Sequence, residues 1–180
     1  MKTRNIVLSC ILISSIILSS CSASKEEQIK NINELNEKVT NSVKTSFDSE
    51  SAVKLLDAYQ NYIDEFESDS ITPEYHFKAA ILSADMLKHK VAIPLLLSFI
   101  DKYPDNINTP MAIFRLANLY ESQVFDLENA RKYYDLFLQK FPNSELAELV
   151  KLSVLNMGKT PEQLYDEVVG ADSSKVDSLN

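Results

Sequence analysis

The chain has 180 residues, of which 45% are hydrophobic, 2 are glycine and none is tryptophan, and its formal net charge is −8. So few glycines leave few positions for positive φ angles, which disfavours β-sandwiches, barrels and glycine-rich phosphate loops. The acidic balance repels nucleic acid and anionic lipid headgroups, so we expect neither as a ligand.

The N-terminus has the pattern of a bacterial export signal. Lys2 and Arg4 form a short cationic start, and residues 6–18 are almost wholly apolar or hydroxylic. This stretch is shorter than the roughly 20 apolar residues needed to span a bilayer, so it predicts a signal peptide rather than a membrane-spanning helix. It ends in Leu18-Ser19-Ser20-Cys21, which resembles the lipobox of bacterial lipoproteins.

The lipobox resemblance implies cleavage after residue 20 and acylation of Cys21. Residues 1–20 would be the lipoprotein signal peptide, and residues 21–25 a lipidated N-terminus and tether. Two or three acyl chains would anchor the protein in effect permanently, since each buried methylene contributes about 0.8 kcal/mol. In such lipoproteins an Asp after the cysteine tends to retain the protein at the inner membrane. Ser22 therefore implies the outer membrane, with the domain facing the periplasm.

The residues after the anchor have two interpretations. In some Gram-negative lineages an acidic stretch such as Ser24-Lys25-Glu26-Glu27 routes a lipoprotein to the cell surface. Alternatively, Ser24 and Glu27 form a capping box that opens the first helix, which we favour. The other cysteine, Cys10, lies in the signal segment. The exported domain would therefore contain no thiol for a disulfide, a zinc site or a nucleophile.

Helical periodicity begins near residue 26. Two stripes of apolar residues, spaced mostly three or four apart, predict a first pair of helices over about 26–67. Asp48 or Ser49 would cap the second of these helices. The stripes are Ile29, Ile32, Leu35, Val39 and Val43, followed by Ala52, Leu55, Tyr59, Ile63 and Phe66.

Prolines mark the ends of the later helices. Pro104 and Pro142 end the helices before them, because a residue before proline avoids the α-helical conformation. Pro94 is tolerated if its own helix begins near Val91, where a first-turn residue has no intrahelical acceptor. Three threonine–proline pairs predict an N-cap followed by proline in the first turn. They are Thr72-Pro73, Thr109-Pro110 and Thr160-Pro161.

The last predicted helix of the main body runs from a Ser144 cap to Met157 and stops at Gly158. Residues 170–180 are short and polar, so we expect them to form a flexible tail. Residues 26–169 are therefore predicted to form one all-α domain of about eight helices joined by short turns.

Self-comparison reveals an internal repeat. The block 99–105, FIDKYPD, recurs 38 residues later as 137–143, FLQKFPN, and residues 62–66, YIDEF, match the same block 37 residues earlier. Between these blocks, 77–80 aligns with 114–117. Ala92 aligns with Ala130, so one residue is inserted between the paired helices of the second copy.

These residues resemble the tetratricopeptide repeat. Its first helix carries a large apolar residue, a small residue and an aromatic, and its second helix begins around a small residue such as Ala92 or Ala130. The resemblance implies a short α-solenoid of helix hairpins, with two full copies over 73–142, a degraded pair at about 26–67 and a closing helix at 144–157. The first-helix residues are Leu116, Ala117 and Tyr120 in one copy, and Ala79, Ala80 and Ser83 in the other, where Ser83 departs from the pattern.

The same repeated sequence pattern resembles that of periplasmic helical lipoproteins that assist outer-membrane assembly. This similarity implies a scaffold that binds protein partners of the cell envelope and acts in envelope assembly or maintenance. The alternative is a structural docking subunit of a larger secretion or motility complex. A fixed stoichiometric assembly would favour the second interpretation, and sub-stoichiometric clients the first.

In the repeat family, the first helix of each hairpin lines a concave binding surface. A repeated cation at one register has no packing purpose, so we expect Lys78 and Arg115 to contact the partner. Phe77 and Phe114 fit either this surface or the core between repeats. By alignment, the residues on the surface are Glu74, Phe77, Lys78 and Ile81 in one copy, and Met111, Phe114, Arg115 and Asn118 in the next.

No pattern in the sequence indicates catalysis, a cofactor or a small-molecule substrate. The two histidines, His76 and His89, fall near opposite ends of one predicted helix, too far apart to share a metal ion. The acids at residues 64–69 read as a solvated turn, because no glycine bends them into a calcium loop. Nucleophile and phosphate-binding motifs are absent from the sequence. We therefore predict a binding protein and not an enzyme.

Overall fold

The computed structural model describes residues 23–42 and 48–167. The signal peptide, Cys21 and the tail 170–180 lie outside the described residues, as does Val43. Within them the chain is helical with no strand, and residues 161–167 form a further short helix. The elements are α2 (Lys25–Ser42), α3 (Ser49–Glu65), α4 (Thr72–Asp85), α5 (His89–Lys102), α6 (Thr109–Leu119), the π-helical segment η1 (Tyr120–Val124), α7 (Leu127–Lys140) and α8 (Ala147–Asn156).

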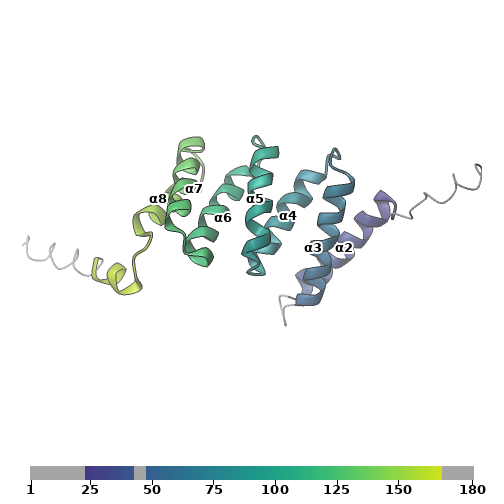
Figure 1. The fold of residues 1–180 in the computed structure, drawn as a ribbon, viewed down its shortest axis with the longest axis horizontal. Helices are drawn as coiled ribbons and strands as arrows, with labels where there is room; N and C mark the ends of the chain where they lie inside the picture. Colours follow the sequence, from purple (N-terminus) through teal and green to yellow (C-terminus); the bar gives the residue numbers. More distant parts are fainter. Residues whose placement is uncertain (1–22, 43–47, 168–180) are drawn as a thin grey trace, which may run out of the picture.

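The helices form antiparallel hairpins that stack in one row (Figure 1). The pairs α2–α3, α4–α5 and α6–α7 are the hairpins, and α8 packs on α7 at the end of the row. Each helix contacts the next one along the chain, including across the junctions between hairpins. The predicted all-α solenoid of tetratricopeptide-like hairpins is confirmed.

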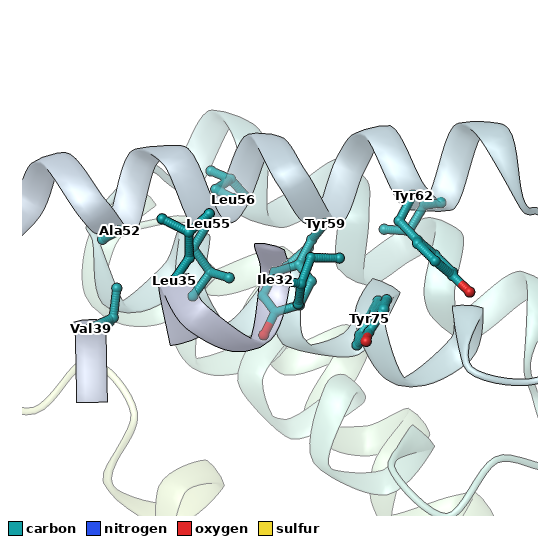
Figure 2. Packing of buried hydrophobic residues seen from close by; sticks show 11 residues of the cluster. Ile32, Leu35, Val39, Ala52, Leu55, Leu56, Tyr59, Tyr62 and Tyr75 are labelled. Carbon is teal, nitrogen blue, oxygen red and sulfur yellow. The ribbon is translucent and has the colours of Figure 1, made fainter. Parts of the chain in front are cut away.

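The core runs through the stack as three adjoining clusters of buried residues. The first joins α2, α3 and the start of α4, and Figure 2 shows its leucines and tyrosines between these helices. Small residues lie where paired helices cross: Ala80 and Ala92 in one hairpin, and Ala117 and Ala130 in the next, have no exposed surface. A larger side chain at these positions would force the helices apart.

The turns between hairpins repeat one geometry. Helices α3, α5 and α7 end at C-cap residues Phe66, Tyr103 and Phe141. Three residues further along, Asp69, Asn106 and Ser144 each donate their backbone N–H to the carbonyl of that C-cap, at 3.0–3.1 Å. Their side-chain oxygens in turn accept the N–H of Ile71, Asn108 and Leu146. The turn after α7 therefore has the same hydrogen-bonded geometry as the turns after α3 and α5.

The expected role of Thr72 and Thr109 as N-caps was wrong. Helices α4 and α6 do begin at these residues with proline in the first turn, but their N-cap positions are Ile71 and Asn108. The two buried hydroxyls instead donate backwards, Thr72 to the carbonyl of Phe66 and Thr109 to that of Tyr103, each at 2.6 Å. The caps come earlier because Asp69 and Asn106 already supply the turn with side-chain acceptors.

Several other predicted helix ends are confirmed, although the N-cap of α8 is Leu146 rather than the predicted Ser144. The Asp48 carboxylate accepts the N–H of Ser51 at 3.0 Å, and the Ser24 hydroxyl accepts that of Glu27 at 3.2 Å. Thr160 and Gln163 exchange two bonds, from backbone to side chain in both directions, as a capping box. Gly158 has φ +77°, the left-handed conformation that commonly ends helices.

The α4–α5 hairpin differs from the prediction at its turn. Helix α5 begins at His89 rather than near Val91, so the two histidines lie on different helices and Pro94 is inside α5, beyond the first turn. The reason is the tight connection: the Lys88 N–H bonds the Ser83 carbonyl at 2.9 Å, and the Lys88 carbonyl already accepts the N–H of Val91 and Ala92. Pro94 therefore removes one helical hydrogen bond.

The residue inserted in the second full repeat is absorbed by η1. The backbone N–H of Phe125 and of Asp126 both reach back to the Tyr120 carbonyl. This wider turn lets the Glu121 carboxylate accept a hydrogen bond from the Tyr134 hydroxyl at 2.7 Å. Burial, followed by this carboxylate, raises the pKa of Tyr134 to about 12. The insertion therefore lies at the end of the first helix and ties it to the second.

Candidate functional site

A mainly apolar hollow on the described surface lies between the first two hairpins and has a volume of about 230 Å³. Helices α2 and α3 form one wall and α4 forms the other. We call this hollow the α4 groove. Its lining residues are Asn36, Val39, Leu55, Tyr59, Phe77, Lys78, Ile81, Leu82 and Asp85.

Three of the predicted surface residues, Phe77, Lys78 and Ile81, meet in the α4 groove. They share it because spacings of three and four residues lie on one face of a helix. Lys78 forms an ion pair with Glu74 one turn earlier, at 2.6 Å, and its ammonium lies 6.0 Å from the centre of the Tyr75 ring. The groove thus has an apolar floor and a charged rim.

A second hollow of about 250 Å³ continues from the first. We call it the α6 hollow, and it contains two more of the predicted residues, Arg115 and Asn118. Asp85 lines both hollows, and its carboxylate lies 3.7 Å from the Arg115 guanidinium. The lining residues of the α6 hollow are Ala84, Asp85, Leu87, Arg115, Asn118, Leu119 and Gln123.

The reasoning that selected Lys78 and Arg115 was wrong in one respect. Both cations have acidic partners on α4, Glu74 and Asp85, so each has a role within the chain. Their side chains nevertheless remain about 40% exposed. Exposed ion pairs contribute about 0–1 kcal/mol, so a partner molecule could replace either intramolecular contact at little cost.

Phe77 and Phe114 were each expected either on the binding surface or in the core, and the structure places them differently. Phe77 packs on Phe99 with ring centres 5.4 Å apart and also lines the α4 groove. Phe114 packs on Tyr134 at 6.2 Å within the third core cluster and lines neither hollow. Glu74 and Met111 also lie outside both linings, although Glu74 reaches the rim through Lys78.

Sequence reasoning missed the wall that the first hairpin contributes, such as Val39 and Tyr59, and the link provided by Asp85. Asp85 lies seven residues after Lys78 on the same face of α4, so extending that stripe would have found it. The first-hairpin residues had no comparable signal, because the repeat pattern there is degraded.

Within residues 23–42 and 48–167, no group of three or more histidine, cysteine or acidic side chains could hold a metal ion. None of the described helices is long and apolar enough to cross a membrane.

His76 is buried, and neither ring nitrogen makes a hydrogen bond of good geometry among the described residues, although the Leu95 backbone lies nearby. The His76 ring packs in a T-shaped arrangement against the rings of Phe99 and Tyr103, with ring centres 5.7 and 5.8 Å apart. His76 therefore belongs to the core.

Comparison with known proteins supports the repeat assignment. Residues 111–144 match the family model of the tetratricopeptide repeat. The chain contains a tetratricopeptide repeat. The match covers most of α6, all of η1 and α7, and the turn that follows. No curated protein matches the chain. Tetratricopeptide repeats generally mediate protein–protein interactions and are typically non-catalytic, which favours a scaffold.

Proposed function

We propose that this protein is a scaffold, anchored in the outer membrane through acylated Cys21, which binds a protein partner in cell-envelope assembly or maintenance. The α4 groove is the observation that carries the binding role. Its apolar floor and its Lys78–Glu74 rim suit a segment with apolar side chains on one face and charges at their edge. The adjoining α6 hollow, with Arg115 and Asp85, extends the surface for a longer partner segment.

The N-terminal signal supports the anchored location. The lipobox places the acylated residue only four positions before Lys25, where α2 begins. Four residues span at most about 14 Å, so an acylated Cys21 would hold this end of α2 close to the bilayer. The start of α2 is itself fixed to the turn between α3 and α4 by an ion pair between Lys25 and Asp69. The tether would thus attach to an ordered part of the stack.

Partner capture tests the binding role. Crosslinking in intact cells, followed by purification of the tagged chain, should recover a partner whose yield falls at least fivefold in the double variant Lys78→Glu, Arg115→Glu. The matched control is Lys54→Glu, Arg131→Glu, which reverses two exposed cations that have acidic partners on α3 and α7. The groove proposal fails if both double variants capture the partner equally well.

Lipid labelling tests the anchor separately. Cells fed an alkyne analogue of palmitate should label the wild-type chain, and Cys21→Ser should abolish the label and leave the unprocessed chain. Fractionation should place the labelled chain with the outer membrane. Absence of label on the wild type would remove the anchor from the proposal and leave the binding role to the capture experiment.

A further inference from the structure

His76 is a histidine at a position that the repeat reserves for the core. In the 37-residue register that aligns 77–80 with 114–117, His76 corresponds to Ile113. Ile113 has no exposed surface, and His76 is only 2% exposed. Because isoleucine fills this position in the next hairpin, packing alone does not require a titratable ring here. The exchange of an apolar residue for histidine therefore points to a role beyond packing.

The surroundings of His76 suit the neutral ring and not the charged one. Its two ring contacts are to Phe99 and Tyr103, and neither nitrogen makes a hydrogen bond of good geometry among the described residues. The Leu95 backbone favours the charged form in part. An imidazolium has two N–H donors, so a single carbonyl leaves at least one of them unpaired in the core. Burying an unpaired charged donor is costly.

The charged groups around His76 oppose its protonation as well. Burial has the largest effect in lowering the pKa of His76, and the positive charge of Lys102 on α5 lowers it further. Glu67 pairs with Lys102 at 2.6 Å and not with the histidine. Helices α3 and α6 also contact α4, but neither contributes a charge to this shift. In acid, an opened hairpin therefore takes up the proton more readily than the packed one.

A single aromatic ring links His76 to the α4 groove. The ring of Phe99 on α5 lies 5.7 Å from that of His76 and 5.4 Å from that of Phe77, measured between ring centres. Phe77 follows His76 directly in α4 and lines the groove together with Lys78 and Ile81. The same contacts therefore hold α4 against α5 and place one wall of the groove. An opening between these two helices would displace that wall.

The α4–α5 hairpin can open without the rest of the stack. The stability of a repeat array is roughly a sum over its repeats and their interfaces, so one hairpin can open locally. The ring contacts of His76 with Phe99 and Tyr103 lie within this hairpin, and Pro94 removes one helical hydrogen bond from α5. In the α6–α7 hairpin the same position holds Ile113, which takes up no proton.

We propose that His76 is a pH-sensitive switch: α4 stays packed on α5 at neutral pH and separates from it in acid, so that the α4 groove holds its partner at neutral pH and releases it on acidification. Because the folded hairpin disfavours the proton, opening should increase as the pH falls below 6.5, the ordinary pKa of histidine. The release of a partner rests on the proposed function of the groove, whereas the opening of the hairpin does not.

Hydrogen exchange of the purified full-length chain in detergent, read by mass spectrometry at pH 7.5 and 5.5, tests the opening. Protection, measured against the unfolded chain at the same pH, should fall in α4 and α5 by up to about tenfold more than in α6 and α7. His76→Phe should abolish this difference, and so should His76→Ile, which copies Ile113. The control is His89→Gln, since His89 is partly exposed at the start of α5 and should leave the difference unchanged.

The outcomes separate the switch from the groove. The switch is overturned if α4 and α5 of the wild type stay as protected as α6 and α7 at pH 5.5. It is also overturned if the difference persists in both His76 variants, because another group would then cause it. Crosslinked partner should decrease from pH 7.5 to pH 5.5 in the wild type but not in His76→Phe, and equal yields at both pH values would overturn the release. Exchange needs no partner, so it decides the switch, while capture at pH 7.5 decides the proposed function.

Discussion

The repeated threonine hydroxyls give a stability prediction with an internal control. Thr72 and Thr109 each donate one short hydrogen bond to the C-cap of the preceding helix. The corresponding position of the third turn, 38 residues after Thr109, is Ala147, which has no hydroxyl. Replacing threonine by valine removes the bond and keeps the shape, and replacing Ala147 by threonine should create the missing bond.

The magnitude follows from what remains after each substitution. In Thr109→Val the carbonyl of Tyr103 still accepts the N–H of Asn106 at 3.1 Å, so no buried acceptor loses all its partners. The cost is then the net value of one hydrogen bond, about 1 kcal/mol in the free energy of unfolding. Thr72→Val should cost the same, since the Phe66 carbonyl keeps the N–H of Asp69. The two turns are separate, so the double variant should lose about 2 kcal/mol.

The third turn supplies the reverse experiment. Ala147→Thr adds a methyl group and a hydroxyl, whereas Ala147→Val adds the same volume without the hydroxyl. We expect the threonine variant to exceed the valine variant by about 1 kcal/mol, because the Phe141 carbonyl occupies the acceptor position that Tyr103 has in the previous turn.

Urea denaturation followed by circular dichroism measures all these variants at one pH, with the denaturation slope compared between them. Equal stabilities for threonine and valine at positions 72, 109 and 147 would refute the reasoning. Threonine would then occupy these positions for its shape alone.

Three further predictions concern the core and the turns. Burial, aided by the charge of Lys102, lowers the pKa of His76 below its ordinary value of 6.5, although the nearby Leu95 backbone opposes the shift in part. The unfolded chain therefore binds this proton more readily, so stability should fall as the pH drops below about 6.5, and His76→Phe should flatten that loss in urea titrations between pH 8 and 5.5. Phe125 has φ +59° and is 80% exposed, so a side chain there costs energy that glycine does not. Phe125→Gly should therefore raise the unfolding free energy by up to about 1 kcal/mol. Leu127→Gly, at the start of α7, should lower it in the same assay. Leu96 is fully buried in the second core cluster, so Leu96→Ala should lower the free energy of unfolding by about 2–5 kcal/mol and lower the thermal midpoint. A loss below about 1 kcal/mol would show that α5 moves to close the cavity.

The sequence by itself determined the local features of this protein. Apolar residues at helical spacing defined each helix, because one face of a helix must be buried. Asp48 and Gly158 marked their helix ends through local effects, a side-chain cap in the first case and a left-handed backbone conformation in the second. The 37- and 38-residue offsets set the number of hairpins, because each copy of the pattern supplies one pair of helices.

Only the tertiary structure decided the features that depend on residues distant in sequence. The α4 groove needs Val39 and Tyr59 from the first hairpin, and no local pattern links them to Ile81. The hydroxyls of Thr72 and Thr109 have an acceptor six residues back, which competes with the capping role that local preference assigns to threonine. Leu149, Leu152 and Leu155 of α8 are apolar, yet they are exposed because no described helix covers them. A periodic pattern shows which face of a helix is apolar, but the arrangement of the other helices decides what covers that face.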